Sequence, residues 1–421
     1  MSFFLGGGGS KAKPQFTGLQ TQTSSSALPI TPIWGQNRVA NNILWQDDFE
    51  THKKKQKVGK GGGSATTYTY SASFILGLCW GPIIGIGKVW KDKSIETYAG
   101  LGMSLFLGSN PQSPWGYLTS NHPNQALGYP DIAYLAVANY DLESSNSLPQ
   151  HSFEVKGLRW DTGVGGSAGA LDADPALVIE DFLSSELYGI PAFDYSMVEA
   201  NSLMSTASAT TTGDNAFQTY CRAMGFAFSP ALIAQEKATE ILNRWTKLLN
   251  TALIWTGYSL KFLPYGADTV TANGVTYLPS FPIRYVITDD DFEDAGESKD
   301  PVTFDRTDPA DAFNTLSLII SNRSNEYNEL PVSWHDQGLV DEYGRKPEDN
   351  FEAREITEPD MAAILVTLMG QRKSYVRNTF NFTLPPKYCL LEAGDIVTLQ
   401  DPRLGSFNLM ITEIEENEEG H

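Results

Sequence analysis

The sequence is poor in the residues from which metal and redox sites are built. Only three of its 421 residues are cysteines, and Cys79, Cys221 and Cys389 lie far apart inside apolar runs. That distribution favours buried thiols over a disulfide framework or a zinc site. The five histidines are scattered, with no two at metal-ligand spacing. We therefore expect neither a metal nor any other cofactor.

Basic residues are also scarce. Fifty acidic against 30 basic residues give a net charge of −20, which argues against a nucleic-acid-binding surface. The exception is residues 53–60, where five of the eight positions are lysine. A solvated linker is the favoured interpretation of this run, and contact with an acidic partner is the alternative.

Long apolar runs are missing as well. The most apolar stretch, residues 74–87, is too short to cross a bilayer and is interrupted by glycine and proline. The start of the chain, MSFFLGGGGSKAKP, has no cationic segment of the kind that opens a signal peptide. We expect a soluble protein without a membrane span, made in a reducing compartment.

Catalytic motifs are absent or lack their structural context. Residues 165–169 read G-x-S-x-G, but no buried strand precedes them and no helix follows directly, as a nucleophile elbow requires. The glycine-rich stretches 59–64 and 85–88 lack the spacing of a phosphate-binding loop. The chain is therefore predicted not to be an enzyme.

One acidic cluster stands out. It packs five carboxylates into six positions: Asp289, Asp290, Asp291, Glu293 and Asp294. The glycine at position 296 does not fit a calcium loop, so a solvated turn is favoured over cation binding. The cluster is also a candidate acidic lining for a channel or surface.

What the sequence does contain is strand patterning around residues 66–97. Polar and apolar residues alternate from Thr67 to Phe74, as in a half-buried strand, and continuous apolar character follows to Cys79. Gly81-Pro82 breaks the strand, a second one runs over residues 83–90, and a turn follows at 91–94. With further strands near 100–107, 132–140 and 153–160, residues 66–170 predict a β-rich barrel or sandwich.

Helices enter in residues 171–330. Asp174-Pro175 predicts a helix start, further helices are predicted from about Tyr195 and from Asp214 to Gly225, and another spans about 235–249. Hairpins are expected at 252–263 and around Asn273-Gly274. This region is predicted to be a mixed α/β domain.

Residues 331–421 return to strands. A helix over 361–369 is apolar on all sides and is therefore expected to be buried. Strands are predicted at 378–384, 388–391, 396–399 and 409–414. The fold class is thus α+β and multidomain, with two β-rich barrel domains flanking a mixed helix and strand region.

The first 65 residues are predicted to be an arm and linker. Glycine and serine tracts separate short apolar pieces that carry Trp34, Trp45 and Phe49. These side chains are costly to leave in water, so we expect the arm to contact a neighbouring subunit or another protein. A chain lacking residues 1–50 should then keep its fold and fail to assemble.

Several short motifs keep the order found in a known family. The series begins with Gly81-Pro82-Ile83, continues through Asp174-Pro175-Ala176 and Tyr343-Gly344-Arg345, and ends with residues 393–397 before Asp401-Pro402. Over residues 66–412 the chain resembles the tail-tip hub family of long-tailed phages, which includes the lambdoid tip attachment proteins and the hub of gene transfer agents.

This resemblance implies a structural virion protein at the tail tip, assembled in the host cytoplasm. Its fold would be a homotrimeric hub whose β-barrels form a pseudo-sixfold ring that closes the tail tube. The implied partners are the distal tail protein ring, the tape-measure protein and receptor-binding fibre or tip proteins. DNA would pass through without specific binding, along a pore that we expect to be net negative. The alternative function is a tail-associated cell-wall hydrolase, which an assay on peptidoglycan would reveal.

Overall fold

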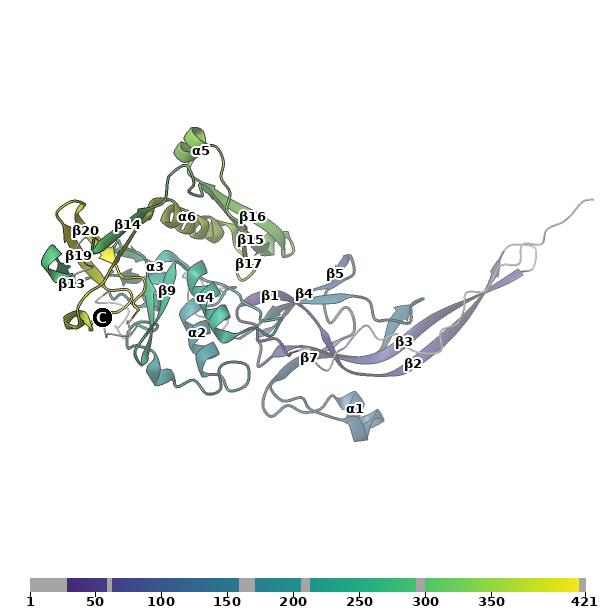
Figure 1. The fold of residues 1–421 in the computed structure, drawn as a ribbon. Helices are drawn as coiled ribbons and strands as arrows, with labels where there is room; N and C mark the ends of the chain where they lie inside the picture. Colours follow the sequence, from purple (N-terminus) through teal and green to yellow (C-terminus); the bar gives the residue numbers. More distant parts are fainter. Residues whose placement is uncertain (1–28, 59–62, 159–170, 206–212, 293–299, 416–421) are drawn as a thin grey trace, which may run out of the picture. The chain divides into compact units, whose positions relative to one another are not determined.

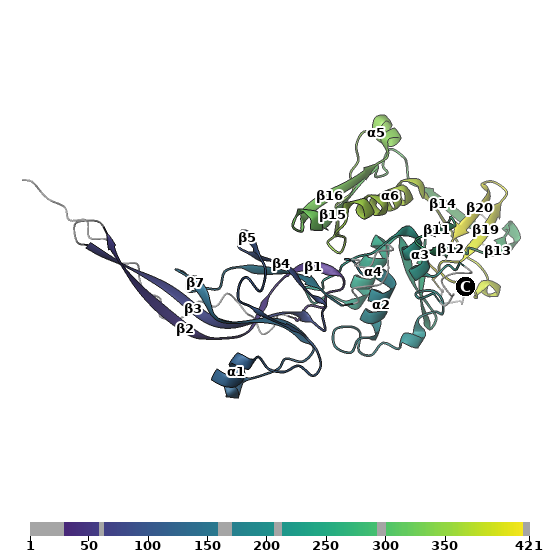
Figure 2. The ribbon, with the colours of Figure 1, turned by 180° about the vertical axis from the view of Figure 1, so that it is seen from behind.

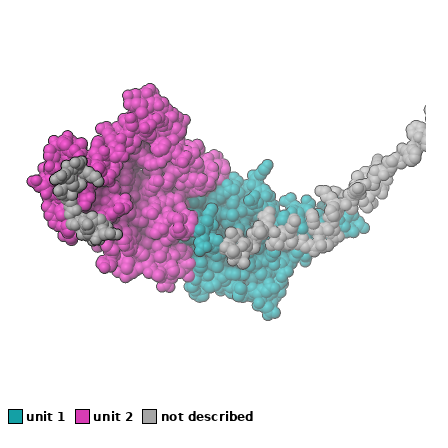
Figure 3. All heavy atoms as spheres, in the orientation of Figure 1, with its two compact units in different colours: residues 1–160, 231–235 teal, residues 161–230, 236–421 magenta. Residues whose placement is uncertain are grey.

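The computed structural model describes residues 29–58, 63–158, 171–205, 213–292 and 300–415. The chain divides into two compact units, shown in separate colours in Figure 3. Unit 1 comprises residues 1–160 and 231–235, and unit 2 comprises residues 161–230 and 236–421. Helices and strands occur together, so the α+β multidomain class predicted from the sequence is confirmed. The division into four domains stays a prediction.

Unit 1 is built from two four-stranded antiparallel sheets (Figures 1 and 2). The first sheet has the strand order β2 (Asn42–Val58), β3 (Gly63–Trp80), β7 (Ile132–Glu143) and β6 (Ser104–Leu107). The second has the order β1 (Gln36–Ala40), β8 (His151–Lys156), β4 (Gly85–Lys91) and β5 (Ser94–Glu96). A short helix, α1 (Gly116–Asn121), and a 3₁₀ turn, η1 (Pro123–Gln125), lie between β6 and β7.

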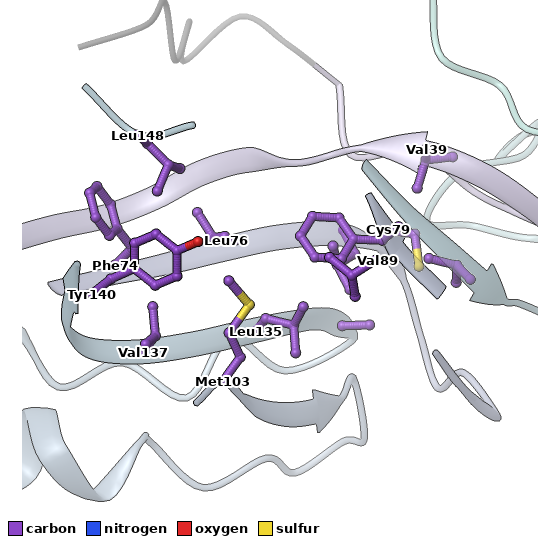
Figure 4. Packing of buried hydrophobic residues seen from close by; sticks show 14 of the residues in the cluster. Val39, Phe74, Leu76, Cys79, Val89, Met103, Leu135, Val137, Tyr140 and Leu148 are labelled. Carbon is purple, nitrogen blue, oxygen red and sulfur yellow. The ribbon is translucent and has the colours of Figure 1, made fainter. Parts of the chain in front are cut away.

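The core of unit 1 lies between these two sheets (Figure 4). Alternate residues of β3, including Phe74 and Leu76, pack in one cluster with Val89 of β4 and Phe153 of β8. The opposite face of β3 is covered too, because Ile75 packs in a second cluster that includes two residues from the segment around α1. Burial on both faces explains why alternation gives way to continuous apolar character after residue 73.

The predicted break between the first two strands of this region is confirmed. Trp80 ends β3, and the backbone of Gly81 runs against the segment that follows β6. A Cβ on Gly81 would lie 2.5 Å from the carbonyl oxygen of Leu107, so this close approach requires glycine. The predicted turn at residues 91–94 joins β4 to β5, with Asp92 in the left-handed region at a φ of 50°.

The closed barrels implied by the resemblance are not seen in the described residues. Each four-stranded sheet of unit 1 ends in edge strands, which are β2 and β6 in one and β1 and β5 in the other. The side chains that would line a barrel instead fill the space between two facing sheets. Unit 1 therefore has the sandwich arrangement that the strand spacing also allowed.

Unit 2 begins with the predicted helices and hairpins. Its first elements are α2 (Pro175–Ser184), α3 (Phe217–Met224), α4 (Ala238–Leu248), the hairpin β9 (Thr251–Thr256) and β10 (Ser259–Pro264), and the hairpin β11 (Val270–Ala272) and β12 (Val275–Tyr277). Asp174 caps α2 by accepting a hydrogen bond from the Ala176 amide at 2.9 Å. Gly225 ends α3 at a φ of 71°, as predicted. The helix predicted from Tyr195 is wrong, since that segment makes only the 3₁₀ turn η2 (Tyr195–Met197).

The described residues in the rest of unit 2 form three small sheets and two helices. β15 (Thr315–Asn322) lies between β16 (Asn328–His335) and β17 (Phe351–Ala353), and β19 (Ile396–Asp401) lies between β13 (Ile283–Ile287) and β20 (Gly405–Met410). β14 (Val302–Arg306) pairs with β18 (Asn378–Phe382). The helices are α5 (Gln337–Tyr343) and α6 (Pro359–Tyr375). The strand predicted at 388–391 is wrong, because Tyr388 ends the 3₁₀ turn η5 (Pro386–Tyr388) and a turn follows it.

Helix α6 packs against β16 at a glycine. A Cβ on Gly370 would lie 2.0 Å from the indole ring of Trp334, so the helix can approach the strand only with glycine at this position. The helix was predicted to be buried on all sides. That prediction is wrong for one face, where Ile364 is 43% exposed. Apolar character alone does not require burial, because much of any protein surface is apolar.

A buried histidine makes the stability of unit 1 depend on pH. The Nδ1 of His151 donates to the carbonyl oxygen of Pro149 at 2.7 Å, and its Nε2 accepts from the Tyr140 hydroxyl at 3.0 Å, which together fit the neutral ring. Burial lowers the pKa of His151; the Pro149 carbonyl and Asp92 oppose this shift, and Lys91 adds to it.

Because the unfolded chain takes up a proton that the folded histidine resists, unit 1 should lose stability as the pH falls below about 6.5. We expect a loss of at most about 1.4 kcal/mol per pH unit, and a smaller slope in a His151→Gln variant. Urea titrations at pH 7.5 and 5.5 measure it, with His335→Gln on an exposed histidine as control. Equal slopes in the wild type and the His151→Gln variant would contradict the assignment.

Candidate functional site

The described residues offer no metal centre. Within them, no group of three or more His, Cys, Asp or Glu side chains could hold a metal ion. Among the described helices, none has both the length and the apolar content for a membrane crossing. The G-x-S-x-G pattern at 165–169 lies outside the described residues. The candidate functional sites are therefore surfaces, and they begin with the three predicted arm residues.

Trp34 lies in a bonded segment of unit 1, contrary to the expectation that it lies in an arm with little structure. Its side chain is fully buried. The flanking backbone is bonded to distant segments: the amide of Trp80 donates to the Thr31 carbonyl at 3.0 Å, and the amide of Leu158 donates to the Ile33 carbonyl at 2.6 Å. Residues 36–40 form β1 at the edge of the second sheet, and the backbone of residues 31–35 is bonded to other segments of the same unit.

Trp45 and Phe49 lie on β2, where both are half-buried against their own unit. Phe49 stacks on Tyr70 of β3, with ring centroids 5.5 Å apart. Trp45 donates from its indole nitrogen to Gln125 at 2.5 Å and meets the ring of His122 edge-on at 5.2 Å. That these residues also contact a partner stays a prediction.

A polar cluster fastens the segment around α1 to β2. Asp48, at a bulge in the strand, accepts hydrogen bonds from the Tyr117 hydroxyl at 2.8 Å and from His122 at 3.0 Å. Partial burial raises the pKa of Asp48, but the hydrogen bonds from Tyr117 and Ser73 and the charge of His122 outweigh it, and the net shift is downward. No local pattern in the sequence indicates this cluster, since 69 positions separate Asp48 from Tyr117.

The strands β2 and β3 continue beyond the rest of their sheet (Figure 1). Pairing between them runs to Val58 and Gly63, whereas β7 leaves β3 at Tyr70. The part of β2 from Thr51 onward and its partner segment on β3 are therefore a two-stranded ribbon. Residues 53–58 of the lysine run that was predicted to be a linker lie on it, and Lys53 to Lys55 are exposed.

The acidic cluster is only partly within the described residues. Asp289 and Asp290 are exposed in the 3₁₀ turn η3 (Asp289–Asp291), as expected of a solvated turn. Asp291 instead accepts hydrogen bonds from Thr288, at 2.8 Å from its hydroxyl, and from Lys387 at 2.6 Å. The hydrogen bond from Lys387, with those from Thr288, lowers the pKa of Asp291 far below its usual range. Glu293 and Asp294 lie outside the described residues.

Comparison with known proteins gives a match to one family model over part of the chain and a similarity in fold to a solved structure. Residues 237–414 match the model of a family described as "Putative phage tail protein". The match lies wholly within unit 2. No curated protein matches the chain.

Among solved structures, the chain is similar to one described as "Virion of native gene transfer agent (GTA) particle". The alignment covers 97% of this chain and 90% of that one, with 17% identity and a TM-score of 0.58. The prophage tail protein gp18 from Listeria monocytogenes EGD-e aligns over 82% of this chain and 79% of its own, with 11% identity and a TM-score of 0.31. The first similarity supports a shared fold, and the second is too low to support an argument.

Proposed function

We propose that this chain is a structural subunit of a phage-type tail. The observation that carries the proposal is the family match over residues 237–414, which takes in most of unit 2. The likeness in fold to a chain of a gene transfer agent virion supports it over nearly the whole length. The order of short motifs over residues 66–412 points in the same direction.

Within the tail, we assign the chain to the tip, as a hub that closes the tube and joins it to receptor-binding parts. The resemblance implies a homotrimeric hub, and closed rotational symmetry is the usual arrangement of a ring built from one chain. Its neighbours are the distal tail protein ring, the tape-measure protein and the fibre or tip proteins. DNA leaves through the centre of the ring without specific binding.

The channel of this ring is lined by more acidic than basic side chains. The net charge of −20 supports this, since carboxylates repel a duplex whereas lysine and arginine would retain its phosphates. Asp289 and Asp290, which are exposed, are candidates for the lining. Asp291 is a weaker one, because Lys387 neutralises it.

Three measurements test the function. Antibody against the chain should label the end of the tail distal to the capsid in electron micrographs of intact particles, and native mass spectrometry of the purified chain should show a trimer. Label along the whole tail, or a purely monomeric chain at all concentrations, would contradict the hub. Release of soluble fragments from purified peptidoglycan would favour the alternative, a cell-wall hydrolase.

A further inference from the structure

The ribbon formed by residues 51–55 and 66–70 has one face that continues the core face of the sheet. Cross-strand partners point to the same side of a sheet, and Lys53 pairs with Tyr68 while Lys55 pairs with Thr66. On β3 that side also carries Tyr70, which is buried in the core, and Tyr68 is partly buried against the same cluster. Lys53 and Lys55 therefore lie on the continuation of the core face, beyond the part of it that the second sheet covers.

This face carries positive charge that the described structure does not neutralise. Between Glu50 and Asp92 the sequence contains no acidic residue. No ion pair in the described part of the chain involves Lys53, Lys54 or Lys55. All three are exposed. The lysines are thus free to meet carboxylates from outside the subunit.

The ribbon also lacks the support that a stable sheet requires. Beyond Tyr70 it has two strands, since β7 ends there and β2 is an edge strand. Isolated two-stranded ribbons are at best marginally stable in water. Lysine on an edge strand also discourages aggregation, but that role does not require tyrosine on the same face.

We propose that this face, defined by Lys53, Lys55, Thr66 and Tyr68 and called the ribbon face, docks on an acidic surface of a second copy of this chain. Each copy carries 50 acidic against 30 basic residues, so it offers the complementary charge. In a closed ring, every copy gives one ribbon and receives one. A DNA duplex would meet the lysines with phosphates and offer Tyr68 little apolar surface, whereas a protein surface can offer carboxylates beside apolar side chains. The inference rests on the proposed self-assembly and not on the location in the tail.

The test reverses the charge of the ribbon face in the full chain. A Lys53→Glu/Lys55→Glu variant should raise the dissociation constant for self-association at least tenfold, measured by sedimentation velocity between 50 and 500 mM salt. The matched control is Lys93→Glu/Lys237→Glu, which changes the net charge equally at two exposed lysines outside the ribbon. The control should associate like the wild type, and association of the wild type should weaken with salt.

A second variant separates the ribbon face from the ribbon's general charge. Lys54 pairs with Thr67 and lies on the opposite face, so Lys54→Glu should have a small effect. Hydrogen exchange of β3 and β7 confirms that each variant is folded. Four results would overturn the inference. The first three are a monomeric wild type, unchanged association in the folded Lys53→Glu/Lys55→Glu variant, and an equal loss of association in the matched control. The fourth is that the wild type binds a 30-base-pair duplex, that this binding requires Lys53 and Lys55, and that the duplex competes with self-association. A trimer that survives in the Lys53→Glu/Lys55→Glu variant would refute the docking and leave the trimeric hub standing.

Discussion

Replacing Arg323 by alanine should destabilise unit 2 by about 3–5 kcal/mol, because it leaves a buried carboxylate without its positive partner. Arg323 is 9% exposed and pairs with Asp172, which has the same exposed fraction. Removing one member of such a pair is far more costly than removing a surface ion pair, since the remaining charge cannot regain its hydration.

The pair sits in a network that joins segments far apart in the sequence. Asp172 also accepts hydrogen bonds from Ser229 at 2.5 Å and from Thr357 at 3.1 Å. The guanidinium of Arg323 reaches Glu358 at 2.8 Å, at the start of α6. The network therefore connects the segment before α2, the end of β15 and the start of α6, and its loss should loosen all three.

Hydrogen exchange on the intact chain measures this effect by unit. Peptides of α2, β15 and α6 should lose protection in Arg323→Ala, whereas unit 1 should not change. The matched control is Arg354→Ala, which removes a 54% exposed arginine from its pairs with Glu329 and Glu352 and should cost no more than about 1 kcal/mol. In an Arg323→Met/Asp172→Asn double variant the loss should be smaller than the sum of the single losses. Equal effects in Arg323→Ala and Arg354→Ala would show that the network contributes little.

Local signals in the sequence predicted much of the secondary structure. The period-two pattern of residues 67–74 predicted β3, and Asp174-Pro175 predicted the start of α2. Asn273-Gly274 predicted a tight hairpin, and both residues have the positive φ that a type I′ turn needs. In each case the residues that form the element also carry the signal.

Strand β2 shows why other elements could not be predicted. Its alternation is interrupted by bulges at residues 43–45 and 47–50, and its second half is a polar lysine run. It is a strand because β3 supplies its hydrogen bonds, and a single segment does not reveal its partner. The same holds for the parallel pairing of β13 with β19, whose residues are more than 100 positions apart.

The candidate sites also divide into features with a local sequence signal and features that depend on distant pairing. The lysine run was visible in the sequence, but its position on a ribbon with one core-facing side depends on the register with β3. The pairing of Asp172 with Arg323 spans 151 positions and left no pattern. Trp34 was recognised as too apolar for water, and its burial within the single chain depends on bonds to residues more than 40 positions away, which leave no local pattern.

Trp34 yields the second large prediction. If the tryptophan belongs to the core of its own unit, Trp34→Ala should destabilise unit 1 by about 3–5 kcal/mol, the usual cost of truncating a fully buried tryptophan. The protection of β1 and β8 should fall most, because the backbone around residue 34 is bonded to the segment after β8. The structure also reverses the expectation that a chain without residues 1–50 keeps its fold. Such a chain lacks all of β1 and half of β2, so it should be more damaged still.

The control for Trp34 is Trp255, which is 54% exposed on β9 of unit 2. Trp255→Ala makes the same chemical change but should cost far less, because little of its surface is removed from water on folding. Hydrogen exchange and urea unfolding of both variants are measured on monomeric protein at low concentration, so that subunit contacts do not contribute. Should Trp34→Ala leave the monomer as stable as Trp255→Ala does and abolish only self-association, residue 34 would belong to an intersubunit arm after all. The bonds that residues 31–35 make with Trp80 and Leu158 lead us to expect the opposite.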